Sequence, residues 1–245
     1  MPEWVVAGFW GLVGGIALII GALIGLYARV PQRIIAAIMA FGAGVLISSV
    51  AFELMDEAYR VGGFDASAFG LMGGSVVYFG GDVLLARHAK HRKRSQGQQE
   101  SSSGTALLLG ALLDGIPESL AIGLGLVAGG GVSSAMVVAV FLSNIPESLS
   151  ASSGMVKSGK THAYIIGVWT AVMAVSGLAA ALGYALLGNA DGNTIGFIQS
   201  FAAGAVLTML ASTMMPEAYE EGGHIVGILT TLGFLTAFVL SRLEK

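Results

Sequence analysis

Long runs of apolar residues fill almost the whole chain, interrupted only by short breaks that are charged or rich in glycine and proline. A run of about 20 apolar residues is long enough for an α-helix to cross the hydrocarbon core of a bilayer. The pattern therefore predicts an all-α integral membrane protein with eight transmembrane helices. The expected helices cover residues 4–28, 33–57, 66–87, 104–127, 132–156, 162–188, 194–216 and 224–242.

The composition favours the same fold class. A mean hydropathy of +0.80, with 55% hydrophobic and only 11% charged residues, lies far outside the range of soluble domains. The predicted helices use most of the 245 residues, which leaves no room for a separate soluble domain. We therefore expect a single transmembrane domain over residues 1–245.

The longest polar segment lies between the third and fourth predicted helices. Its start is basic and its second half is rich in glutamine, serine and glycine, which predicts a mobile cytoplasmic loop over residues 88–103. Basic flanks stay on the cytoplasmic side, so this loop places most of the 12 lysines and arginines inside. Eight helices then leave both termini external, in the cytoplasmic (inner) membrane; a re-entrant helix would instead give an odd number of spans.

Two sequence repeats organise the predicted helices. Residues 41–63 realign with residues 201–223, on the second and seventh helices, which cross the membrane in opposite directions. The pentapeptide Ile-Pro-Glu-Ser-Leu occurs at 116–120 and again at 145–149, on the fourth and fifth helices. The repeats predict three helices, two central helices and three more, related by inverted symmetry, as in many secondary transporters. The alternative is that duplication merely built a helix bundle.

The two central helices carry acidic residues at membrane depth. Asp114 and Glu118 are four residues apart and share one helix face, and Glu147 occupies the matching position of the second pentapeptide. An ionised carboxylate in hydrocarbon is costly, and three such groups without a basic neighbour repel one another. A divalent cation would neutralise them. The chain has no cysteine, so any ligands are oxygen, imidazole or thioether groups.

Three further polar residues are candidate ligands. Ser143 and Asn144 precede Glu147 on the fifth helix, and they either bind metal or satisfy backbone groups near a proline kink. Glu53, on the second helix, either lines the pathway or is a solvated acid near the helix end. All of these side chains offer oxygen.

The chain resembles the ZIP family (Zrt/Irt-like proteins), membrane carriers that move zinc, iron, manganese and related divalent ions into the cytoplasm. The resemblance covers essentially the whole chain and rests on the paired Pro-Glu motifs, the eight expected helices and the histidine-bearing loop. The segments 55–58 and 215–218 also resemble the Leu-Pro-Glu-Ala ends of the family's second and seventh helices. The resemblance implies Glu118 and Glu147 as metal ligands, with Asn144 as a plausible third.

The chain departs from the family pattern on the fourth helix. The family usually has His-Asn-x-Pro-Glu-Gly there, and this chain has Asp114 and Gly115 in place of histidine and asparagine. A second metal site in some members of the family needs this asparagine and an acid on the sixth helix. This chain has Gly115 and no acid over residues 162–188, so the resemblance implies a single metal centre. Imidazole favours zinc and later transition metals, whereas carboxylate, amide and water oxygens suit manganese, magnesium, calcium or ferrous iron. We therefore expect a metal preference that is broadened or shifted away from zinc.

The sequence thus predicts transport of divalent cations (Zn, Fe, Mn or Cd as substrates) into the cell through one oxygen-rich site. The expected partners are the metal ion and the lipid bilayer, with a homodimer possible by resemblance and no nucleic acid. The open alternatives are a divalent-cation channel and a degenerate, non-transporting membrane protein. An enzyme is not expected, because the segment at Asp82 lacks the full GxGD motif of intramembrane aspartyl proteases.

Overall fold

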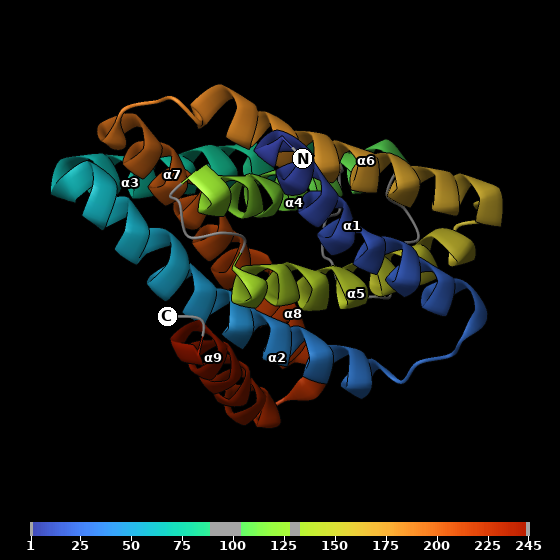
Figure 1. Cartoon of the computed structure of the whole chain (residues 1–245). Helices are drawn as coiled ribbons and strands as arrows, with labels where there is room; N and C mark the ends of the chain where they lie inside the picture. Colours follow the sequence, from blue (N-terminus) through green and yellow to red (C-terminus); the bar gives the residue numbers. More distant parts are fainter. Residues whose placement is uncertain (1, 89–103, 128–132, 244–245) are drawn as a thin grey trace.

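The computed structural model describes residues 2–88, 104–127 and 133–243, and every regular element in these ranges is helical. The predicted loop 88–103 falls outside them except for the backbone of its first residue. Figure 1 shows the helices side by side in one bundle. The elements are α1 (Glu3–Tyr27), α2 (Gln32–Ser49), η1 (Val50–Met55), α3 (Asp56–His88), α4 (Gly104–Val127), α5 (Ser134–Lys157), α6 (His162–Leu187), α7 (Gly192–Met209), η3 (Leu210–Met214), α8 (Met215–Gly222) and α9 (Ile225–Leu243).

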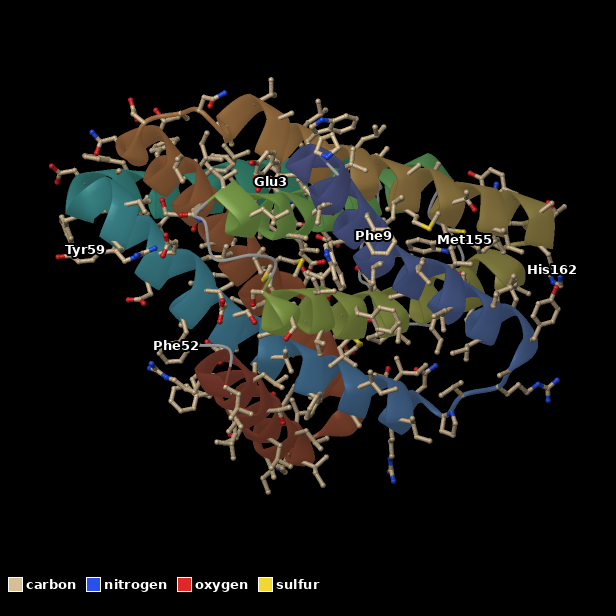
Figure 2. The ribbon with its side chains drawn as sticks, viewed as in Figure 1. Glu3, Phe9, Phe52, Tyr59, Met155 and His162 are labelled. Atoms are coloured by element: carbon tan, nitrogen blue, oxygen red, sulfur yellow. The ribbon has the colours of Figure 1, made fainter. Side chains whose placement is uncertain are left out.

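The described residues include seven helical segments that are long and apolar enough to cross a membrane. The outer surface of the bundle is also apolar. Phe9 and Tyr59 project from it (Figure 2), and the side chain of Leu186 is 75% exposed. Such exposure is unfavourable in water and favourable in lipid. The fold is that of an all-helical, multi-pass membrane protein.

The second and third predicted helices join without a gap. The segment Gln32–Leu85 is continuous over 54 residues and includes α2, η1 and most of α3. Within α3, Gly63 has a non-helical backbone with φ 72° and ψ −173°, a conformation that glycine adopts without steric cost. The α3 ribbon changes direction along its length in Figure 1. The glycine therefore separates two helical arms.

The segments of the long sequence repeat fold alike. Helices α2 and α7 have equal lengths, and each is followed by a π-helix, η1 or η3, that starts at the equivalent residue. Each copy then ends at a glycine with positive φ, Gly63 at 72° and Gly223 at 67°. In Figure 1, α2 and α7 run in opposite senses through the bundle. The repeat is thus visible in backbone conformation as well as in sequence.

The packing of the helices follows the same repeat. Helix α3 packs along α7 as α9 packs along α2, and α1 packs against both α5 and α6. Glycines allow backbone to touch backbone at the first two of these crossings, as is common between membrane helices. A Cβ at Gly74 would lie 1.9 Å from the carbonyl oxygen of Phe201, and a Cβ at Gly233 would lie 2.0 Å from that of Phe41.

The two copies begin differently despite their shared backbone. Asp191 precedes α7, and its Oδ1 accepts a hydrogen bond of 2.7 Å from the backbone N–H of Thr194. This bond lowers the pKa of Asp191, because it stabilises the ionised carboxylate. The equivalent residue before α2 is Pro31, which has no side-chain cap. The two equivalent helices are therefore capped differently, by a carboxylate at α7 and without a side-chain cap at α2.

Candidate metal centre

Helices α4 and α5 carry the repeated pentapeptide and run in opposite directions beside each other in the bundle (Figure 1). Both continue as α-helix through their prolines, Pro117 and Pro146. The side chains of Asp114 and Glu118 are each only 2% exposed. The structure therefore places two acidic side chains of one helix face inside the protein.

Glu118 contacts the facing helix through one oxygen and leaves the other without a partner. Its Oε1 accepts a hydrogen bond of 3.2 Å from Ser143 Oγ on α5. Its Oε2 is buried and has no hydrogen-bond partner among the described residues. A buried acceptor without a partner costs about 1–3 kcal/mol, and more when it is charged. Such an oxygen is available to a ligand.

The surroundings of Glu118 are negative. Glu147, half-buried on α5, and Asp114, one turn away on α4, both act on Glu118 as like charges. The lysines, arginines and histidines whose side chains the structure describes are all exposed, so none of them neutralises the site from within the protein. This arrangement favours binding of a cation.

Asp114 is held by a third helix. Tyr78 of α3, itself 2% exposed, donates its hydroxyl to Asp114 Oδ1 at 2.5 Å. Tyr78 was not predicted as a site residue from the sequence. A signal was available, because a tyrosine buried in an apolar helix almost always directs its hydroxyl to a polar partner.

Asn144 is oriented by α1. Its Nδ2 donates a hydrogen bond of 3.2 Å to the carbonyl oxygen of Gly14. A Cβ at Gly14 would lie 3.2 Å from Val140 Cγ1, so the glycine lets α1 come close to α5. The amide nitrogen thus faces α1, and only the amide oxygen of Asn144 is suited to bind a cation.

The other polar residues of the pentapeptides bond to their own helices. Ser119 donates to the carbonyl oxygen of Gly115 at 2.6 Å, and Ser148 donates to that of Asn144 at 2.8 Å. Glu53 lies half-buried in η1, whose neighbours include α4. The structure therefore joins Ser143 to Glu118 directly and leaves Glu53 on a separate helical segment.

The three central carboxylates do not form a closed cluster. Within the described ranges, no three Asp, Glu, His or Cys side chains lie close enough together to hold a metal ion. Glu118 and Ser143 form the contact between α4 and α5, with Glu147 nearby, while Asp114 is bonded to Tyr78. A cation bound at Glu118 would therefore need serine, amide or water oxygens in addition to carboxylates.

No model of a known protein family matches the chain, and no curated protein matches it. The resemblance to the ZIP family rests on the motifs given above. The function is therefore inferred from the residues of the site and their geometry.

Proposed function

We propose that the protein carries divalent metal cations across the cytoplasmic membrane into the cell, through a single oxygen-rich site between α4 and α5. The observation that supports this most strongly is the environment of Glu118. One carboxylate oxygen accepts from Ser143, the other is buried without a partner among the described residues, and two further acids act on it. A bound cation would give the unpaired oxygen of Glu118 a partner and would also neutralise the three acids.

The proposed carrier has eight transmembrane helices. A helical segment of 54 residues has a length of about 80 Å at 1.5 Å per residue, whereas a bilayer core is about 30 Å thick. The segment Gln32–Leu85 therefore accounts for two spans that meet at Gly63. Eight spans fit the arrangement of three, two and three helices, with both termini on the outer side. The resemblance to the family also implies a homodimer.

The proposed substrates are manganese and ferrous iron before zinc and cadmium. The candidate ligands are the carboxylates of Glu118, Glu147 and Asp114, the amide oxygen of Asn144 and the hydroxyl of Ser143, and Glu53 is a candidate residue of the pathway. Oxygen ligands suit harder cations, whereas zinc gains most from imidazole or thiolate.

Uptake by purified protein in sealed lipid vesicles tests the proposal. Vesicles that contain a metal-sensitive dye should take up Mn²⁺ at a rate that saturates with concentration, because one site must load and unload in each cycle. Protein-free vesicles should show only leak. Uptake equal to that leak would contradict transport, and a rate that rises linearly with Mn²⁺ would indicate a channel.

Asp114→His tests the basis of metal preference. The substitution places imidazole at the fourth-helix position where the family has it, and it should shift the ratio of Zn²⁺ to Mn²⁺ uptake toward zinc by roughly tenfold. Competition between the two ions in the same vesicles measures that ratio. Asp65→His, at an exposed position, is the matched control and should leave it unchanged. An unchanged ratio in Asp114→His would refute Asp114 as a determinant of selectivity.

A further inference from the structure

Tyr78 is the buried polar group of α3 that contacts the candidate centre. Its side chain is 2% exposed and packs in the main apolar cluster, and its hydroxyl donates to Asp114 Oδ1 at 2.5 Å. A hydrogen bond to a carboxylate in so apolar a setting is stronger than one between neutral groups. The bond therefore stabilises the observed orientation of the Asp114 side chain and occupies its Oδ1.

The approach of α3 to α4 is fixed one turn from this bond. A Cβ at Gly81 would lie 3.0 Å from Leu113 Cδ1, so the glycine makes room for the side chain that precedes Asp114. Packing thus sets the distance between α3 and α4 independently of the Tyr78 hydroxyl. Removing the hydroxyl alone should leave this contact in place.

The repeat shows that the bond is not a general requirement of the fold. Gly74 of α3 contacts the carbonyl of Phe201 as Gly233 of α9 contacts that of Phe41, so the two glycines are equivalent. Tyr78 follows Gly74 by four residues, and the residue four after Gly233 is Ala237, which is buried. In the pentapeptide repeat, the equivalent of Asp114 is Ser143. One half of the protein has tyrosine and aspartate where the other has alanine and serine.

We propose that Tyr78 is a positioning residue that competes with the transported cation for Asp114. The proposal rests on the proposed function. Asp114 acts on Glu118 electrostatically, yet no three acids are gathered within metal-binding distance in the described ranges. A cation first meets Glu118, and it gains Oδ1 of Asp114 only when that oxygen gives up the hydroxyl of Tyr78. The hydroxyl thereby weakens cation binding and speeds release.

Tyr78→Phe removes this competition and keeps the ring. In the vesicle assay, the KM for Mn²⁺ should fall roughly tenfold, the effect of one hydrogen bond to a charged group, while kcat falls because release is slower. In an Asp114→Asn background, Tyr78→Phe should change neither constant. Tyr164→Phe, an exposed tyrosine beside Lys160, is the matched control and should match wild type.

A KM that is unchanged in Tyr78→Phe, or that falls equally without the Asp114 carboxylate, would overturn the proposal. Equilibrium binding of Mn²⁺ to the purified proteins separates it from the proposed function. If wild type does not transport but Tyr78→Phe binds Mn²⁺ more tightly, the competition stands and transport is wrong. If neither protein binds Mn²⁺, both proposals are wrong.

Discussion

Glu118→Gln is expected to reduce saturable Mn²⁺ uptake by more than about 100-fold, since loss of a ligand should exceed the 10- to 100-fold effect of outer-shell partners. The amide keeps the shape of the side chain and removes the charge that faces Ser143. It also removes repulsion from Glu147 and Asp114, so the melting temperature of the metal-free protein should not fall. Uptake in vesicles and thermal melting in detergent measure the two effects.

Loss of uptake without loss of thermal stability distinguishes a binding role of Glu118 from a structural one. Glu57→Gln is the matched control, because Glu57 pairs with Arg60 at 2.6 Å in an exposed, local contact. Such pairs contribute little, so this variant should transport like wild type. Normal uptake by Glu118→Gln would refute the metal centre. A variant that neither folds nor transports would instead assign Glu118 a structural role.

Gly74→Ala is expected to destabilise the protein by about 1–3 kcal/mol or more, through overpacking at the crossing of α3 and α7. The added Cβ would lie 1.9 Å from the carbonyl oxygen of Phe201 and 3.0 Å from the backbone nitrogen of Ala205. Backbone atoms cannot rotate away, so the helices must separate. Unfolding in mixed detergent and denaturant measures the change in stability.

The neighbouring glycine provides the control. A Cβ at Gly73 would meet the ring of Phe201 at 3.5 Å, an ordinary contact. Gly73→Ala should therefore be neutral or stabilising by about 0.5–1 kcal/mol, because alanine favours the helix. Equal stability of the two variants would show that α3 and α7 do not touch as closely as described.

Much of the backbone was predictable because the repeat is strong in sequence. The match between 41–63 and 201–223 predicted equivalent helices, and the structure gives them equal lengths and glycine turns at their ends. The π-helices η1 and η3 were not predicted, since apolar periodicity does not register one extra residue in a turn. The unbroken helix up to Gly63 was also missed, because charged residues at 56–60 indicated an earlier end.

The candidate site was predictable to the extent that its residues lie close in sequence. Spacing alone placed Asp114 and Glu118 on one face of α4, and both are buried. A tyrosine in an apolar helix signals that its hydroxyl has a polar partner, but the pairing of Tyr78 with Asp114 was not predictable, nor was that of Gly14 with Asn144. Tyr78 and Gly14 lie on other helices and reach the site only through packing. One sequence carries no direct information on such distances.

The residues that differ between the two halves affect which conformation, outward-facing or inward-facing, the proposed carrier prefers without substrate. Two chemically identical inverted halves would give outward-facing and inward-facing forms of equal energy, because the symmetry exchanges them. Tyr78 and Asp114 are bonded in one half, whereas the equivalent residues of the other half are Ala237 and Ser143. The outward-facing and inward-facing forms would therefore differ in energy. One hydrogen bond to a charged group shifts such an equilibrium about tenfold. In the proposed carrier, a bond from Tyr78 to Asp114 that forms in only one of the two states would bias which side of the membrane the empty protein faces.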